Sequence, residues 1–297
     1  MGGGSTLTMP NPLRILRGLV PVAVLAIGVH AEVGFTGRVL EKVACAADAT
    51  QTYALYVPSS YTPEKKWPVI FCFDPGARGR EPVVRFKAAA EKFGYIVAGS
   101  NNSRNGPWAA NVAAVEAMVR DVRAHLAVDA ERFYSAGLSG GARVATQLAL
   151  AGLAKGVIAC SAGFPVGGNV PGRVTFPFFG TAGTEDFNYP ELKQLDGELE
   201  DRRAAHRIVI FEGGHEWASP ALLSEGVEWI DLQAMRAGKR PKDDVAIQAA
   251  LQRRLAGMEA KPAGAAWQEM KAIAADFKGP VDTSDYERKA KEMGAKR

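Results

Sequence analysis

The segment Gly137-Leu-Ser-Gly-Gly141 places a serine between an apolar strand pattern over 132–137 and an apolar helix pattern over 142–150. We expect a turn there so tight that Ser139 adopts a positive φ, with the flanking glycines keeping strand and helix from colliding. The hydroxyl then stands exposed at the carboxyl end of the strand, beside the helix N-terminus. Because a Gly-x-Ser-x-Gly pattern also arises by chance in a glycine-rich chain, its position between strand and helix is the stronger indication of a nucleophile.

A nucleophilic serine needs a base, and the base needs a group that orients it. The chain has 4 histidines. His30 lies in a segment that we expect to be cleaved, His125 in a helical stretch far upstream, and His206 at the edge of a strand pattern. His215 follows a strand pattern directly, in a loop of glycines, and is the predicted general base.

The predicted orienting acid is Asp186, which also comes just past a buried strand pattern. Glu185 is its neighbour and rival, but the shorter carboxylate is the commoner orienter. The order Ser139, Asp186, His215 along the chain is one of the known orders of a catalytic triad. The alternative is that Asp186 and His215 are ordinary loop residues.

Three segments carry a resemblance to a known superfamily: Gly137-Leu-Ser-Gly-Gly141, Gly180-Thr-Ala-Gly-Thr-Glu-Asp186 and Gly213-Gly-His-Glu-Trp217. They resemble the α/β-hydrolases, and most of all the small secreted esterases of the polyhydroxybutyrate-depolymerase and feruloyl-esterase-like group. The resemblance runs from about Tyr53 to about Met235. It implies an α/β-hydrolase fold, with a mostly parallel central sheet flanked by helices, and ester hydrolysis through Ser139, His215 and Asp186.

Ester hydrolysis through an acyl-enzyme needs two N–H donors for the negatively charged oxygen of the tetrahedral intermediate. Gly140, the residue after the serine, is the first predicted donor. The second should come from Asp74-Pro-Gly-Ala-Arg-Gly79, where such esterases often carry His-Gly. Since proline has no N–H, Gly76 or Ala77 must supply it, and we favour Gly76. Asp74 itself either caps this loop or contacts the substrate.

Aromatic and basic side chains follow the same predicted strands and are candidates for substrate binding. An apolar or aromatic acyl group would meet aromatic residues, each of which can equally be a local packing anchor: Trp108, Phe187, Tyr189 and Trp217. Three arginines on the predicted rim favour an anionic ester as substrate: Arg78, Arg80 and Arg104.

Composition excludes several other classes of protein. The 297 residues, 47% hydrophobic and 23% charged, suit one large α/β domain with a substantial core. The net charge of +4 comes from interspersed acids and bases, so no nucleic-acid surface is indicated. The sequence shows no metal-ligand spacing, phosphate loop or dinucleotide fingerprint, so we expect neither a metal nor a cofactor.

The first 31 residues have the pattern of a signal peptide. Arg14 and Arg17 precede an uncharged, mostly apolar run over 18–29, and Val29-His-Ala31 is a small-x-small cleavage site before Glu32. We therefore expect a secreted or periplasmic protein with no stable membrane insertion after cleavage. The alternative is an uncleaved anchor or a buried helix. Three cysteines form at most one bridge, and the apolar patterns around Cys72 and Cys160 favour buried thiols.

Strand and helix patterns alternate over the predicted catalytic domain, 32–238, as a mostly parallel sheet requires. We expect leading antiparallel strands over 33–43 and 51–57, and a parallel series over 69–73, 96–99, 133–136, 156–160, 176–180 and 207–211. Helices are expected over 83–93, 110–126, 142–153, 190–205 and 220–237. The segment 162–174 is too short for a large lid, which favours an open site.

Beyond a polar, proline-bearing break at residue 239, amphipathic patterns cover 245–258, 265–277 and 286–293. They predict a C-terminal helical extension, 239–297, packed on the catalytic domain, with an interaction surface as the alternative. The chain as a whole is predicted to be a serine esterase acting on a small-molecule or polymer-borne ester. A peptidase of the prolyl-oligopeptidase type shares the triad and its order, and a non-catalytic binding protein on the same fold is the further alternative.

Overall fold

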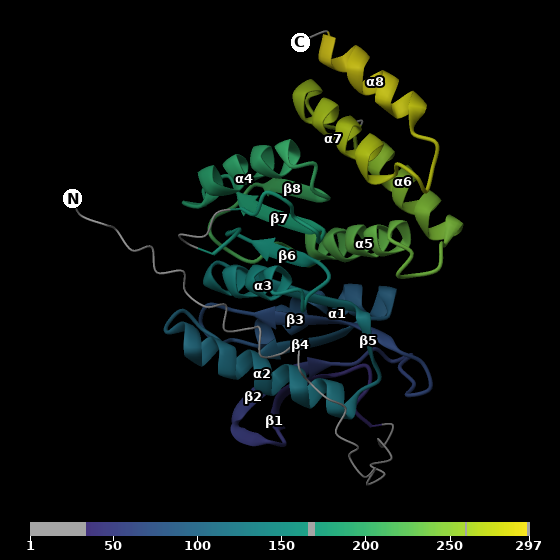
Figure 1. Ribbon diagram of the computed structural model, residues 1–297. Coiled ribbons are helices and arrows are strands. Elements are labelled where there is room, and N and C mark those ends of the chain that lie inside the picture. The colour runs from purple at the N-terminus through teal and green to yellow at the C-terminus, as the bar shows by residue number, and fades with distance from the viewer. Residues whose placement is uncertain (1–33, 166–169, 259, 296–297) are drawn as a thin grey trace, which may run out of the picture.

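The computed structural model describes residues 34–165, 170–258 and 260–295, so the predicted signal peptide lies outside the described residues. Its centre is an eight-stranded sheet in the order β1-β2-β4-β3-β5-β6-β7-β8 (Figure 1). The strands are β1 (Val39–Cys45), β2 (Asp48–Tyr56), β3 (Trp67–Phe73), β4 (Ile96–Ser100), β5 (Val128–Leu138), β6 (Val157–Cys160), β7 (Phe178–Gly183) and β8 (His206–Phe211). The β1–β2 and β2–β4 pairs are antiparallel, and all later pairs are parallel.

Helices cover both faces of this sheet. They are α1 (Arg80–Phe93), α2 (Trp108–His125), α3 (Gly140–Leu150), α4 (Tyr189–Asp201) and α5 (Pro220–Arg236). One apolar cluster joins the sheet to α2, α3 and α4, and a second cluster joins its other face to α1 and α5. Alternate residues of β3 belong to the two clusters: Phe71 packs in the first and Cys72 in the second. The predicted α/β architecture with a mostly parallel sheet is therefore confirmed.

The register of the parallel strands brings their carboxyl ends together. Phe73 at the end of β3 pairs with Gly137 of β5, and Cys160 at the end of β6 pairs with Leu138. On the other side, Gly183 at the end of β7 pairs with Phe211 of β8. The loops that follow these strands therefore leave the sheet at one edge, where the predicted site residues lie.

Element boundaries differ from the sequence prediction at several places. β5 begins at Val128 rather than 133, and β7 runs from Phe178 to Gly183 rather than over 176–180. β7 extends because Ala182 and Gly183 continue the parallel ladder with β8. β2 begins at Asp48 rather than 51, since the polar residues that open it pair across a hairpin at the exposed edge.

The C-terminal segment forms α6 (Asp244–Met258), α7 (Ala263–Asp276) and α8 (Ser284–Ala295). In Figure 1 these helices, drawn in yellow-green and yellow, lie beyond α5, at the opposite end of the molecule from β1 and β2. A third apolar cluster contains Leu232 of α5 together with Ile247, Leu251, Ile273 and Phe277. These helices therefore share a core with α5.

The connection from β6 to β7 contains no helix or strand in its described part, and the described residues form no large lid over the sheet edge, as predicted. Within the described ranges, no helix combines the length and apolarity needed to cross a membrane. Cys45, Cys72 and Cys160 are buried free thiols, as the sequence predicted for Cys72 and Cys160. Burial raises the pKa of Cys45 to about 11, so this group stays a thiol at neutral pH.

Candidate active site

Ser139 occupies the predicted tight turn between β5 and α3, with φ 54° and ψ −122°. A non-glycine residue in this region carries strain of about 1–3 kcal/mol. The neighbouring glycines allow the turn to close: a Cβ on Gly141 would lie 2.0 Å from the Phe73 carbonyl oxygen, and one on Gly137 would lie 2.2 Å from the Gly141 oxygen. The Ser139 amide is held by the carbonyl of Cys160 at 2.8 Å. The turn therefore has one strongly determined conformation.

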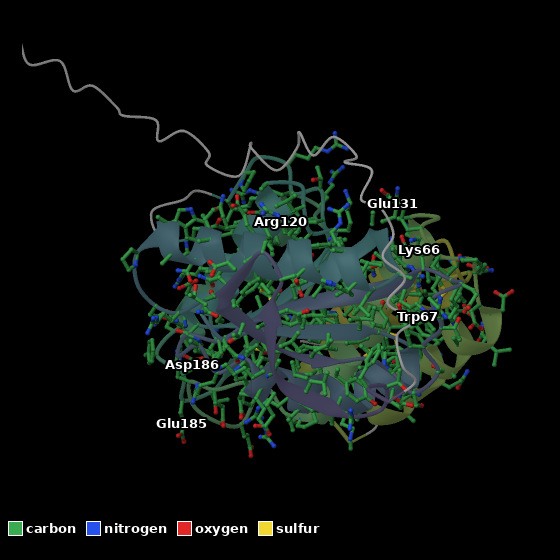
Figure 2. All side chains as sticks on the ribbon, turned by 90° about the horizontal axis from the view of Figure 1, so that it is seen from below. Lys66, Trp67, Arg120, Glu131, Glu185 and Asp186 are labelled. Carbon is green, nitrogen blue, oxygen red and sulfur yellow. The ribbon has the colours of Figure 1, made fainter. Side chains whose placement is uncertain are left out.

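Asp186 and His215 are joined by a hydrogen bond of 2.8 Å between Asp186 Oδ1 and His215 Nδ1. The Asp186 side chain is fully buried, whereas 22% of the His215 side chain is exposed. A carboxylate only accepts, so Nδ1 carries the proton and Nε2 is left as the acceptor. Glu185 is exposed, and Figure 2 shows it at the outer margin of the molecule. Of the two neighbouring carboxylates, Asp186 is the one that orients the imidazole.

The Asp186 carboxylate is only partly neutralised by its other neighbours. Its Oδ1 also accepts a hydrogen bond from the Asn188 amide at 2.8 Å. Its Oδ2 is buried and has no hydrogen-bond partner among the described residues. The Asp186 carboxylate is thus positioned between the His215 ring and the Asn188 amide, and both contacts are made by Oδ1.

Ser161, which follows β6, ties the acid loop to the histidine loop. Its Oγ donates to the carbonyl of Glu216 at 3.2 Å, and its own carbonyl accepts from Asn188 Nδ2 at 2.8 Å. Ser161 has a positive φ of 59°, a second strained position at this sheet edge. The Glu185 amide completes the connection by donating to the Gly213 carbonyl at 2.9 Å. These contacts fix the two loops relative to each other.

An ion pair links the helix after the serine to the helix after the acid. Arg143 of α3 and Glu191 of α4 form a bidentate pair, with Nη1–Oε1 at 3.0 Å and Nη2–Oε2 at 2.7 Å. Glu191 Oε1 also accepts from the Gly163 amide at 2.9 Å. Bidentate arginine–carboxylate pairs add geometric specificity as well as energy. The pair holds α3 and α4 in register at the level of the site.

The fully buried carboxylate of Asp74 organises the loop after β3. It accepts from the Gly76 amide at 2.8 Å, from Arg78 Nε at 2.8 Å and Nη2 at 3.0 Å, and from Trp217 Nε1 at 2.9 Å. Burial raises the pKa of Asp74, but the hydrogen bonds from Arg78, Trp217 and Gly76 outweigh it and bring the pKa below its ordinary value. Asp74 is therefore an ionised brace between this loop and the loop that carries His215.

This arrangement contradicts the predicted second oxyanion donor. The Gly76 amide donates to Asp74 Oδ1, and the Ala77 amide donates to the Asp74 carbonyl at 3.1 Å. Neither N–H is free for a substrate oxygen, because a carboxylate two residues ahead captures the Gly76 amide in an Asx-type turn. Gly140 is the first residue of α3, where N–H groups have no acceptor within the helix.

One predicted substrate-binding residue is corrected, and two of the three predicted rim arginines lie in ion pairs. Trp217 is 3% exposed, meets Phe86 edge-on at 6.5 Å and donates to Asp74, so it is a packing anchor and not a pocket wall. Arg78 is held by Asp74, and Arg80 Nε lies 2.6 Å from Glu41 Oε1. Both arginines are therefore occupied within the fold.

Two predicted aromatic residues do lie at the surface of this edge. Phe187 is 73% exposed and its ring stacks on that of His215, with ring centroids 4.0 Å apart and an interplanar angle of 23°. Trp108 opens α2 and is 37% exposed. Tyr189, the first residue of α4, is half-buried.

Among the described residues no group of His, Cys, Asp and Glu is arranged to hold a metal ion.

No protein-family model and no curated protein matches the sequence. Solved structures do match the chain. The fluorophosphonate-binding serine hydrolase FphF of Staphylococcus aureus is 12% identical, with a TM-score of 0.51 over 65% of this chain and 97% of that chain. A ferulic acid esterase is 16% identical, with a TM-score of 0.51 over 66% and 98% of the two chains. Esterase B from Lactobacillus rhamnosis is 14% identical, with a TM-score of 0.50 over 68% and 90%.

The chain has the α/β-hydrolase fold. Its strand order and its mostly parallel sheet agree with these similarities, which at such low identity concern the fold. In the α/β-hydrolase fold a nucleophilic serine stands on a strained strand-to-helix turn at the top of the sheet, followed along the chain by the acid and the histidine. Ser139, Asp186 and His215 follow β5, β7 and β8 in that order.

Proposed function

We propose that this protein is a serine hydrolase that cleaves carboxylic esters, with Ser139 as nucleophile, His215 as general base and Asp186 as the orienting acid. The observation that carries the proposal is the 2.8 Å hydrogen bond between Asp186 and His215 at the sheet edge where Ser139 stands on its strained turn. The fold similarity to proteins described as serine hydrolases and esterases supports the same class of reaction.

In the proposed reaction Ser139 Oγ attacks the ester carbonyl carbon while His215 Nε2 takes the hydroxyl proton. The carbonyl oxygen becomes negatively charged and accepts a hydrogen bond from the Gly140 amide. The alcohol leaves with the proton from His215, and an acyl-Ser139 ester remains. Water then attacks this ester with His215 again as the base, which releases the acid and restores the serine. Asp186 stabilises the imidazolium in both halves of the reaction.

The substrate side of the proposal rests on Phe187 and Trp108. The Phe187 ring covers one face of His215 and offers its exposed outer face to an acyl group. An open sheet edge with aromatic side chains at the surface suits an apolar or aromatic acyl group on a small molecule or on a polymer. A feruloyl or acetyl ester, or a depolymerase-type substrate, belongs to this class.

Fluorophosphonate labelling of the protein, with the adduct located by peptide mass spectrometry, tests the reaction class. We expect one stoichiometric adduct on Ser139, none in Ser139→Ala, and a labelling rate at least about 10³-fold lower in His215→Ala, because the base activates the hydroxyl. A folded sample that stays unlabelled would overturn the proposal and favour a non-catalytic binding protein.

Matched ester and peptide panels then separate the esterase from a peptidase of the prolyl-oligopeptidase type. We expect hydrolysis of aryl and alkyl esters of aromatic acids, and no cleavage of prolyl peptides above the background of Ser139→Ala. Peptide cleavage with a higher kcat/KM than ester cleavage would reject the esterase assignment while leaving the serine mechanism intact.

We further propose that the protein is exported to the periplasm or secreted, on the pattern of the first 31 residues. Expression of the full chain in a bacterial host with an active secretion pathway, followed by intact-mass analysis, tests this. A mature N-terminus at Glu32 in the periplasmic or culture fraction is expected, and a chain retained uncleaved in the cytoplasm or the membrane would contradict it.

A further inference from the structure

The candidate site has one oxyanion donor from the nucleophile turn and lacks the expected second donor from the loop after β3. The Gly76 and Ala77 amides both donate within that loop, to the Asp74 carboxylate and the Asp74 carbonyl. A tetrahedral intermediate held by the Gly140 N–H alone would lose a large part of the stabilisation that two preorganised donors give. The missing hydrogen bond would have to come from another polar group beside Gly140.

Asn105 lies directly against Gly140. Its Oδ1 is 1.8 Å from the position that a Cβ on Gly140 would take, and its Nδ2 is 3.6 Å from the same position. A side chain at residue 140 would therefore displace this carboxamide from its place beside the nucleophile turn. Among the described residues no hydrogen bond engages the Asn105 carboxamide, and the residue is exposed. The group is thus adjacent to the nucleophile and available to a ligand.

Hydrogen bonds to the loop after β3 and to α2 hold the backbone of the loop that carries Asn105. The Asn105 amide donates to the Pro75 carbonyl at 2.9 Å, and Arg104 forms a β-bridge with Gly76. The buried Asn111 side chain binds the backbone of Arg104 on both sides, accepting from its N–H at 2.9 Å and donating to its carbonyl at 3.0 Å. The backbone that carries the Asn105 side chain is therefore fixed beside the nucleophile turn, which keeps the carboxamide within reach of an oxygen bound by the Gly140 N–H.

We propose that the Asn105 carboxamide is the second oxyanion donor of this hydrolase, completing with the Gly140 N–H the pair that receives the substrate oxygen. This inference rests on the proposed function. The carboxamide has two N–H donors and one acceptor, so a half-turn about its last side-chain bond exchanges Oδ1 and Nδ2 in nearly the same space. With substrate bound, Nδ2–H donates to the oxygen that becomes negatively charged, and no covalent bond to Asn105 forms or breaks. Asn105 is thereby a catalytic residue.

Steady-state kinetics of Asn105→Ala and Asn105→Asp on one aryl ester test the proposal. We expect kcat to fall by about 10²–10³-fold in Asn105→Ala with KM changed by less than about threefold, the pattern of a donor that acts mainly in the transition state. Asn105→Asp keeps the size and shape of the side chain but presents a carboxylate, so kcat should fall at least as far. Full activity of Asn105→Asp would overturn the proposal, because it would show that only the shape matters.

A transition-state analogue separates catalysis from loop structure. A trifluoromethyl ketone forms a hemiketal oxyanion on Ser139, so its Ki should rise by at least about 30-fold in Asn105→Ala, while the Ki of the product acid stays within about threefold. Asn101→Ala is the matched control: Asn101 lies in the same loop, but its Nδ2 donates to the Glu41 carbonyl and to Thr52 Oγ1, away from Gly140. The kcat of Asn101→Ala and the Ki of the ketone for this variant should stay within about threefold of the wild-type values.

The outcomes distinguish the two proposals. If wild type is labelled at Ser139 and hydrolyses esters, but Asn105→Ala and Asn105→Asp keep kcat and the Ki for the ketone within about threefold, only the role of Asn105 is overturned. If wild type is neither labelled nor active, the proposed function itself fails. Equal losses in Asn105→Ala and in the Asn101→Ala control would show a structural effect of the loop and would also reject the role of Asn105.

Discussion

At the scale of single residues, the arginines near the candidate site differ in whether a carboxylate of the protein already pairs with them. The guanidinium of Arg78 is held by Asp74 and that of Arg80 by Glu41, whereas Arg104 is exposed and has no ion pair among the described residues. Arg104 stands next to Asn105, one residue from the group that contacts Gly140. It is therefore the arginine best placed to meet a negative charge on a substrate.

We expect Arg104→Ala to raise KM for esters that carry a second, free carboxylate by about fivefold, since an exposed ion pair contributes about 1 kcal/mol at most. KM for the matching neutral esters should stay unchanged, and the selective effect should shrink in high salt. Arg80→Ala, which removes an arginine paired to Glu41, is the control and should change neither. Equal effects of Arg104→Ala on acidic and neutral esters would reject a role in charge recognition.

The sequence predicted the turn that carries Ser139 and the pairing of Asp186 with His215, because each depends on local order along the chain. Each of these residues follows a strand or a turn whose pattern is visible in the sequence. The role of Asp74 was only half foreseen, and Trp217 was misplaced. Asp74 and Trp217 are hydrogen-bonded to each other but lie 143 residues apart in the sequence. No local pattern therefore indicates whether the Trp217 indole meets a substrate or a buried carboxylate. The role that we propose for Asn105 was not predicted either, because it depends on a contact with Gly140 that the local sequence does not indicate.

At the scale of elements, the loops after β3 and β8 are joined through one ionised group, Asp74. Its carboxylate receives N–H groups from its own loop and from Trp217, two residues after His215. Because the folded-state pKa of Asp74 lies below its ordinary value, the ionised form contributes stability above the unfolded value of about 3.9. That contribution is lost as pH falls through the folded-state pKa. The link between the two loops is therefore expected to weaken in acid.

Asp74→Asn tests this link. At pH 7 we expect a loss of about 1.5–3 kcal/mol in the free energy of unfolding, because charge-assisted hydrogen bonds to a buried group are removed or inverted. The difference between variant and wild type should shrink below about pH 4, as the wild-type carboxyl takes up its proton. Urea unfolding at pH 7 and at about pH 2 measures it. Asp285→Asn, on the exposed face of α8, should show no comparable change. A difference that is the same at both pH values would contradict the assignment.

The alternation of strands and helices was predictable because burial of a parallel sheet on both faces imposes continuous apolar runs, as in β3. The ends of elements were less predictable. β7 gains Ala182 and Gly183 only because β8 offers partners for them, and β2 begins with polar residues that pair across a hairpin. Those extensions depend on neighbouring strands, so the sequence pattern of the strand itself does not indicate them.

At the scale of the whole molecule, the C-terminal helices are attached to the hydrolase-fold sheet by buried charges as well as by apolar contacts. Arg254 of α6 lies between Glu269 at 2.7 Å and Asp276 at 2.5 Å, and Glu269 also meets Arg207 of β8 at 3.2 Å. Burial lowers the pKa of Arg254, but Asp276 and Glu269 outweigh it and raise the pKa above its ordinary value. Burial raises the pKa of Glu269, and Arg207 and Arg254 bring it below its ordinary value. Arg254 and Glu269 therefore stay charged at neutral pH, each stabilised by the other and by its second partner.

Asp276 is the member of this network that also reaches α5, since its Oδ1 accepts from Trp229 Nε1 at 2.7 Å. Asp276→Ala leaves both the buried Arg254 guanidinium and the Trp229 indole without this acceptor. We expect a loss of about 3–5 kcal/mol in the free energy of unfolding, the range for removing one partner of a buried ion pair. Arg288→Ala, which removes two exposed ion pairs on α8, is the control and should cost less than about 1 kcal/mol.

Asp276→Ala also tests whether the C-terminal helices and the sheet unfold together. Because Leu232 of α5 belongs to the cluster that α6 and α7 form, we expect Asp276→Ala to unfold in a single transition at lower urea, with kcat/KM unchanged in the native protein. The candidate site lies at the carboxyl edge of the sheet and shares none of the side chains of this network. Two separate transitions, with ester hydrolysis surviving the first, would show instead that α6 to α8 form an independent unit. A change in kcat/KM under native conditions would show that the network also positions the site.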